Sequence, residues 1–123
     1  MSSSGALRVL VADADPSILS LLMAVAQHMG LGAVPARDAN AAVALAAQQE
    51  FAAAVIDLSV NNPELVTRLV EVCPPLRGNV IVLTTLPPGV LENSAEAFCV
   101  LRKPFQLQDL QQSLRHCCAA RGR

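Results

Sequence analysis

The residue types in this 123-residue chain that can do chemistry come directly after short apolar runs. Four runs are each followed by such residues, namely Asp13 and Asp15, Asp57, Thr84 and Thr85, and Lys103 with Pro104 and Phe105. Carboxylates, hydroxyls and an amine gathered in one place can bind a cation and a charged ligand. Each position alone also has a structural explanation, because aspartates cap helices, threonines end strands and a lysine before proline can form a turn. The four positions together favour a shared site.

The four runs are predicted strands because they are short and apolar and because longer segments with a helical period separate them. They span 7–12, 53–56, 80–83 and 98–101, and a weaker run at 33–36 predicts a fifth strand. Near-continuous apolar strands that alternate with helices are typical of a parallel sheet covered on both faces. We therefore predict an α/β fold with a doubly wound, five-stranded parallel sheet. Ligands of such sheets bind beyond the carboxyl ends of the strands, where the polar residues are expected.

The first helix carries the clearest signals. Asp15 is its predicted N-cap, Pro16 occupies the first helical position, and Gly30 marks its end. A second helix is expected to be capped by Asp38 and to run to about 48, and a third to run from Pro63 to about 73. The region over 85–98 contains Pro87, Pro88 and Gly89 and is expected to be irregular. A last helix is expected over 107–117.

Composition and charge narrow the classes of protein. A content of 53% apolar residues suits one domain over 1–123, with a core of about 6–119. A formal net charge of −1 and an aromatic content of 2% argue against nucleic acid as a direct partner. The apolar runs are too short to span a bilayer and no signal-peptide pattern is present, so we expect a cytoplasmic protein with no membrane partner.

The four cysteines are Cys73, Cys99, Cys117 and Cys118. They show no CxxC spacing, which favours core or surface thiols over a metal site. An intermolecular disulfide through adjacent Cys117 and Cys118 is a minor alternative that requires their exposure.

Four segments, VLVADADPS, AAVIDL, VIVLTT and LRKPF, resemble the signature segments of two-component response-regulator receiver domains. Each segment is short, but their order and their placement at strand ends are specific as a set. The resemblance covers almost the whole chain. It implies the CheY-like variant of the flavodoxin-like fold, and relative to that family the third and fourth helical segments are shortened.

The resemblance also implies roles for individual residues. Asp57 would accept a phosphoryl group from a phosphohistidine on a histidine kinase or phosphotransfer protein. Mg²⁺ would be held by Asp13, Asp57 and the backbone carbonyl of Ser59. The remaining roles fall at the ends of the last two strands: Lys103 would pair with the phosphoryl group, Thr84 next to Thr85 would act as the switch, and Pro104 would follow a cis peptide bond.

Three departures from the receiver pattern bear on this site. Ala14 stands where receivers usually have a second acid, so one metal ligand is missing and Mg²⁺ binding should be weakened. Asp15 is an optional replacement ligand, but a capping role competes with that and is favoured. Val100 replaces the usual aromatic residue, and Asn61 and Asn62 replace a hydrophobic residue and a proline after the acceptor.

Two other readings remain open. The first alternative is a degenerate receiver that binds a protein without phosphorylation. The Asp13-Ala14-Asp15 segment also resembles haloacid-dehalogenase-like phosphatases, with Asp13 as nucleophile and Asp15 as acid, although that reading gives Asp57 no role. We favour a signalling domain over an enzyme, with an unknown downstream protein as partner and homodimerisation left open.

Overall fold

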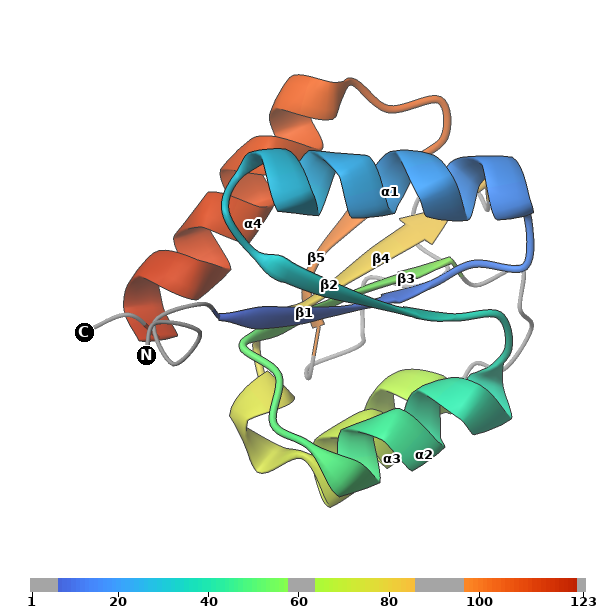
Figure 1. The fold of residues 1–123 in the computed structure, drawn as a ribbon, viewed down its shortest axis with the longest axis vertical. Coiled ribbons are helices and arrows are strands. Elements are labelled where there is room, and N and C mark those ends of the chain that lie inside the picture. Colours follow the sequence, from blue (N-terminus) through green and yellow to red (C-terminus); the bar gives the residue numbers. More distant parts are fainter. Residues whose placement is uncertain (1–6, 58–63, 86–96, 122–123) are drawn as a thin grey trace.

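A parallel sheet forms the centre of the computed structural model, which describes residues 7–57, 64–85 and 97–121 (Figure 1). Its strands are β1 (Arg8–Ala12), β2 (Gly32–Ala36), β3 (Ala53–Asp57), β4 (Val80–Thr84) and β5 (Ala97–Arg102). They lie in the order β2-β1-β3-β4-β5, with every neighbouring pair parallel. The predicted doubly wound five-stranded sheet is confirmed, including the weakly signalled strand that became β2.

Strands β3, β4 and β5 each end one residue later than predicted. Asp57 pairs in register with Leu83, and Thr84 pairs with Arg102, so both polar residues belong to the sheet itself. Backbone hydrogen bonds depend little on the side chain, so a strand can continue past its last apolar residue. The length of the apolar run is therefore shorter than the length of the strand. As a result, the two side chains are held by regular backbone at the edge where the strands end.

In the part of the chain that the structure describes, helices cover both faces of the sheet (Figure 1). The helices α1 (Pro16–His28) and α4 (Leu107–Arg121) lie on one face, and α2 (Ala39–Gln48) and α3 (Leu65–Val72) lie on the other. A short 3-10 helix, η3 (Pro74–Leu76), follows α3.

Alternate side chains of the strands enter two separate apolar cores because successive residues point to opposite faces. Val9, Val11 and Val55 pack with the α1 and α4 side, whereas Leu10 and Ile56 pack with the α2 and α3 side. The central strands β3 and β4 are buried along their whole length. These two strands therefore present only their ends to a ligand.

Helix α1 begins and ends as its sequence predicts. Asp15 accepts a hydrogen bond from the Ser17 N–H at 2.9 Å, which confirms it as the N-cap. At the other end, the Leu31 N–H bonds to the Ala26 carbonyl while Gly30 adopts a φ of +82°, a conformation that favours glycine. These contacts fix the direction in which the chain enters β2.

The remaining helices differ from expectation only at their ends. Asp38 caps α2 by accepting from the Ala41 N–H at 2.8 Å, as predicted. The described part of α3 begins at Leu65, and the side chain of its N-cap residue Glu64 makes no capping hydrogen bond. The expected start at Pro63 lies outside the described residues. The irregular region expected over 85–98 lies mostly outside them as well. Among the described residues, no helix is long and apolar enough to cross a membrane.

Candidate functional site

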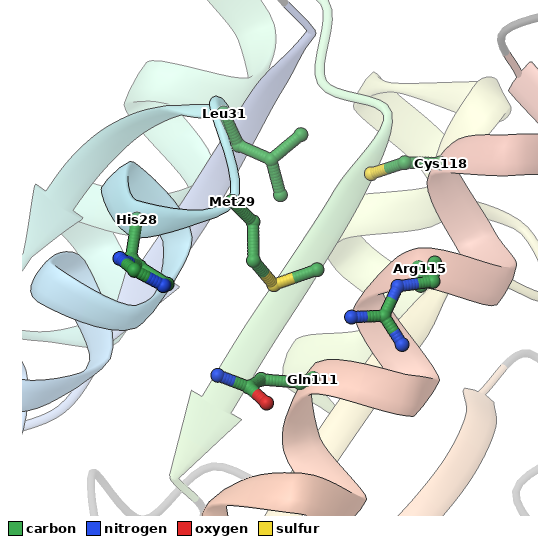
Figure 2. Close-up of a pocket in the computed structure, with 6 residues that line it drawn as sticks. All are labelled: His28, Met29, Leu31, Gln111, Arg115 and Cys118. Atoms are coloured by element: carbon green, nitrogen blue, oxygen red, sulfur yellow. The ribbon is translucent and has the colours of Figure 1, made fainter.

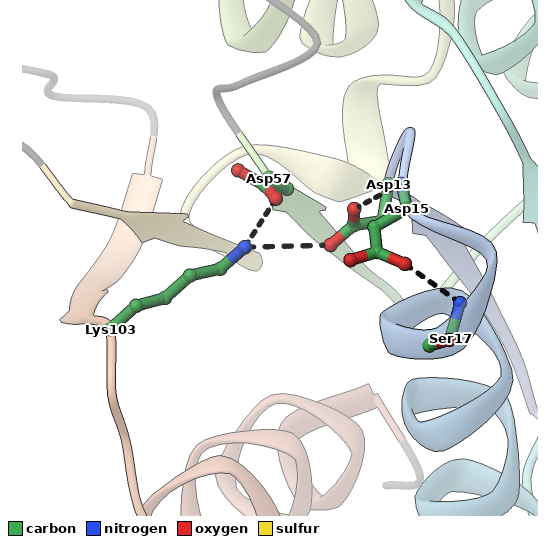
Figure 3. Close-up of polar contacts among 5 residues, drawn as sticks. All are labelled: Asp13, Asp15, Ser17, Asp57 and Lys103. Atoms are coloured by element: carbon green, nitrogen blue, oxygen red, sulfur yellow. Dashed lines mark hydrogen bonds and ion pairs between the residues drawn. The ribbon is translucent and has the colours of Figure 1, made fainter.

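The candidate site lies at the carboxyl ends of β1, β3, β4 and β5, where three of the predicted charged residues meet (Figure 3). Asp57 is the last residue of β3 and only 3% exposed. The connection that follows β1 leads to β2 on one side, and the connection that follows β3 leads to β4 on the other, so the carboxyl ends of β1 and β3 form the topological switch point of the fold. A carboxylate at the end of a central strand is held rigidly, and its position depends on the whole sheet.

Asp13 follows β1 directly and is fully buried. Its backbone N–H donates to the Ala36 carbonyl at 3.2 Å, which extends the pairing with β2 by one residue. Its Oδ1 accepts from the Asp15 N–H at 2.8 Å, and its Oδ2 makes no hydrogen bond to the residues that the structure describes. Oδ1 of Asp13 is thus hydrogen-bonded to the backbone, whereas Oδ2 is a buried oxygen that can serve as a metal ligand.

Lys103, the only lysine of the chain, joins the two aspartates. Its backbone N–H donates to the Thr84 carbonyl at 2.8 Å, and its peptide bond to Pro104 is cis. Its ammonium donates to Asp57 Oδ2 and lies 3.7 Å from Asp13 Oδ2 (Figure 3). The three N–H donors of this compact ammonium allow it to face both carboxylates.

The electrostatics of the cluster favour a further cation. Burial is the main cause that raises the pKa of Asp13, and the neighbouring Asp57 raises it further. The Asp15 N–H and the Lys103 ammonium oppose this by lowering the pKa of Asp13, but the net direction is upward. Two buried carboxylates that face one ammonium leave an excess of negative charge in the cluster. Binding of a divalent cation or a proton would reduce this excess.

Asp15 does not take part in the cluster through its carboxylate. The side chain is exposed and its Oδ1 is engaged with the Ser17 N–H, as an N-cap should be. The interpretation of Asp15 as a cap is therefore confirmed, while its role as an optional metal ligand stays a prediction. Ala14 beside it is exposed, and its methyl side chain has no oxygen that could bind a metal.

The two threonines have different environments. Thr84 is buried at the end of β4, on the strand between Asp57 and Lys103, and its carbonyl fixes the Lys103 backbone. Thr85 is exposed. Of the two, Thr84 is the buried one, and it lies on the strand between β3 and β5.

The carboxylates of Asp13 and Asp57 have the chemistry that a magnesium ion requires of its ligands. Mg²⁺ takes oxygen ligands and is commonly held by one or two carboxylates together with water and phosphate oxygens. Asp13 Oδ2, buried and without a hydrogen bond, is an oxygen of this kind, and Asp57 supplies a second carboxylate. Within the described residues no group of three His, Cys, Asp or Glu side chains is placed to hold a metal. The predicted Ser59 ligand lies outside those residues.

Sequence reasoning did not anticipate the contact between Lys103 and Asp13. It paired Lys103 with the phosphoryl group alone, whereas the structure places the ammonium against both carboxylates. The sequence did offer a signal for this contact, because residues of opposite charge follow different strands of the predicted sheet. Among the other departures, Val100 packs against the core on the α2 and α3 side, and Asn61 and Asn62 lie outside the described residues.

Comparison with known proteins identifies the fold. No protein-family model matches the chain, and no curated protein matches it in sequence. Solved receiver structures do match. A CheY-like response regulator receiver domain protein from Methanospirillum hungatei has a TM-score of 0.83 at 21% identity, covering 94% of this chain and 95% of that one. The signal receiver domain of an HD domain-containing protein from Pseudomonas fluorescens has a TM-score of 0.81 at 25% identity, covering 94% and 96%.

A third solved structure is similar in fold and contains ligands. It is a response regulator from Burkholderia pseudomallei with a phosphorylated aspartic acid, a calcium ion and citrate. Its TM-score is 0.78 at 21% identity, with 94% of this chain and 71% of that chain covered. This chain therefore has the CheY-like receiver fold, and the resemblance seen in its short motifs is confirmed at the level of the fold.

Proposed function

We propose that this chain is a response-regulator receiver of two-component signalling whose Asp57 accepts a phosphoryl group. The donor is a phosphohistidine on a histidine kinase or phosphotransfer protein, and the location is cytoplasmic. The proposal takes 1–123 as one receiver domain. The observation that carries it is the convergence of Asp57, Asp13 and the single lysine at the switch point of a receiver fold.

The chemistry follows from this arrangement. A carboxylate oxygen of Asp57 attacks the phosphorus, the bond from phosphorus to the histidine nitrogen breaks, and the imidazole leaves with the electron pair and takes up a proton. Lys103, already against Asp57, is placed to pair with the phosphoryl oxygens that appear there. Thr84, at the end of the adjacent strand, would donate its hydroxyl to one of them and so report the phosphorylated state.

Magnesium would be held by Asp13 and Asp57, with the backbone carbonyl of Ser59 as the ligand implied by the resemblance. It would neutralise the phosphoryl oxygens. Because Ala14 contributes no carboxylate and the Asp15 carboxylate caps α1, we propose that this metal site is weakened. In support of the general scheme, the similar Burkholderia pseudomallei protein contains both a phosphorylated aspartic acid and a calcium ion.

A degenerate receiver is the second candidate, and one observation favours it. The Lys103 ammonium already faces both buried carboxylates, so the cluster is partly compensated without any metal. Such a domain would bind its partner regardless of phosphorylation. The phosphatase reading has no comparable support, because the Asp15 carboxylate that would serve as acid is engaged as a cap and that reading gives Asp57 no role.

Incubation with acetyl phosphate and Mg²⁺ followed by intact mass measurement tests the proposal. We expect an adduct of one phosphoryl group that hydroxylamine removes, that is absent in Asp57→Asn and that persists in Asp109→Asn, a matched change at an exposed acid on α4. Beryllofluoride should shift the amide resonances of residues around Asp57 and Thr84.

Two results would contradict the acceptor role. Absence of the adduct, together with spectra that beryllofluoride does not alter, would favour the degenerate receiver. Sustained release of phosphate that Asp13→Asn abolishes would favour the phosphatase. An acetyl adduct on Lys103 is distinguished by its mass, and the single lysine makes its assignment direct.

A further inference from the structure

A cavity of about 500 Å³ lies between the end of α1 and one side of α4, apart from the site around Asp57. One wall is formed by His28, Met29 and Leu31, and the other by Gln111, Arg115 and Cys118. Helix α1 begins beside Asp13 and contains 13 residues, so its far end is about 20 Å from that cluster at 1.5 Å per residue. The volume of the cavity is within the range of sites that hold small molecules, about 300–1,000 Å³.

Side chains from both walls project into the space between α1 and α4 (Figure 2). Met29 and Leu31 extend from the turn after α1, and Gln111, Arg115 and Cys118 extend from α4 toward them. The three α4 residues follow at intervals of four and three, so they share one face of the helix. The apolar part of the lining is therefore Met29 and Leu31 on the α1 side, where His28 adds an imidazole, and Gln111 and Arg115 make the α4 side polar.

The charge of this cavity is one-sided. No aspartate or glutamate of the described residues lines it, whereas Arg115 supplies a guanidinium and His28 an imidazole. Burial raises the pKa of the Cys118 thiol, which keeps that sulfur neutral. A ligand entering here meets positive charge and hydrogen-bond donors but no carboxylate.

Arg115 also lacks an acidic neighbour along its own helix. The positions three and four residues away on either side are Gln111, Gln112, Cys118 and Ala119, so no intrahelical ion pair can form. No hydrogen bond or ion pair joins its side chain to the rest of the described chain. A guanidinium in this situation is a ready partner for a carboxylate or phosphate, which it can bind with two parallel hydrogen bonds.

We propose that the cavity between α1 and α4 binds a small organic anion, with its carboxylate or phosphate on Arg115 and Gln111 and its apolar part against Met29 and Leu31. This site is separate from the phosphoryl-acceptor role of Asp57 and does not depend on it. The ligand needs both an anionic group and an apolar part, because Arg115 and Gln111 are polar whereas Met29 and Leu31 are apolar.

Phenylacetate is the probe, titrated into isotope-labelled full-length protein and followed by amide chemical shifts. We expect shifts concentrated at residues 28–31 and 111–118. Arg115→Gln should weaken binding by about tenfold or more, and Arg115→Lys should fall between that variant and wild type because it keeps the charge but loses the paired hydrogen bonds. Arg68→Gln on α3 removes the same charge from the opposite face of the sheet and should leave binding unchanged.

Two further probes test the chemical class. Benzyl alcohol, which has the ring without the charge, and acetate, which has the charge without the ring, should each bind about tenfold more weakly than phenylacetate. Shifts of equal size in Arg115→Gln, equal binding of acetate or benzyl alcohol, or no shifts at 28–31 and 111–118 would each overturn the proposal. Phosphorylation of Asp57 is measured separately by mass, so a failure of one proposal is distinguishable from a failure of the other.

Discussion

Removal of the Lys103 ammonium should destabilise the fold at neutral pH and much less at acid pH. Lys103→Met keeps most of the aliphatic stem while deleting the charge that faces Asp57 and Asp13. At an effective dielectric constant of about 20, a pair of charges 3.7 Å apart interacts by about 4 kcal/mol before solvation costs are counted. Removing one partner of a buried ion pair costs about 3–5 kcal/mol. Because the Lys103 side chain is 23% exposed, we expect the lower value, about 3 kcal/mol.

The pH dependence follows from the raised pKa of Asp13. Lys103 is one of the groups that lower this pKa, so its removal should raise the pKa of Asp13 still further above the ordinary value. An acid whose pKa is raised by folding stabilises the native state most when it is protonated, and that contribution is lost as the pH rises through the folded pKa. The cost of Lys103→Met should therefore be full at about pH 7.5 and fade as the pH falls toward the ordinary pKa of aspartate, near 4.

Urea unfolding followed by circular dichroism measures this effect. With a urea dependence of about 2 kcal/mol per molar, the midpoint of the variant should fall by about 1.5 M at pH 7.5 and by less than about 0.5 M at pH 4, relative to wild type at the same pH. Arg68→Met, which removes a cation from α3, should shift the midpoint by less than about 0.3 M at both pH values. An equal loss at the two pH values, or no loss at pH 7.5, would refute the assignment of Lys103 as the charge that holds the two carboxylates together.

Three further predictions concern the residues around this cluster. Asp15→Ala should lower the free energy of unfolding by about 1 kcal/mol through loss of the N-cap and leave the phosphoryl adduct on Asp57 intact, as urea unfolding and intact mass would show. Ala14→Asp should lower the Mg²⁺ concentration needed for half-maximal phosphorylation by about tenfold, because it adds a carboxylate beside Asp13, and an unchanged requirement would contradict the view that this acid is the missing ligand. Gly30→Ala should cost about 1 kcal/mol, since Gly30 has a φ of +82°, and Gly78→Ala with its φ of +77° provides a second measurement of the same effect.

The elements of the fold were predictable where local signals were strong. Asp15 and Asp38 each cap the helix they precede, since a short acidic side chain can reach the free N–H groups of the first turn from that position. The strand at 33–36 was weakly signalled because it lies at the edge of the sheet, where half-exposure and even Pro35 are tolerated. Ends set by backbone pairing, such as those at Asp57 and Thr84, were one residue beyond what the apolar pattern indicates.

The sequence by itself determined the kind of fold and the residues of the candidate site. Alternating apolar runs and capped helices can satisfy their hydrophobic faces in few ways, and a parallel sheet brings residues that follow different strands to one edge. The tertiary structure decided which of those residues touch. Lys103 lies 46 positions from Asp57 in the chain, and only the order β2-β1-β3-β4-β5 places its ammonium against Asp57 and Asp13. The cavity beside Arg115 likewise arises from the packing of α1 against α4, because neither helix alone encloses it. Contacts between distant segments depend on the whole fold, and the sequence pattern of each segment does not specify them.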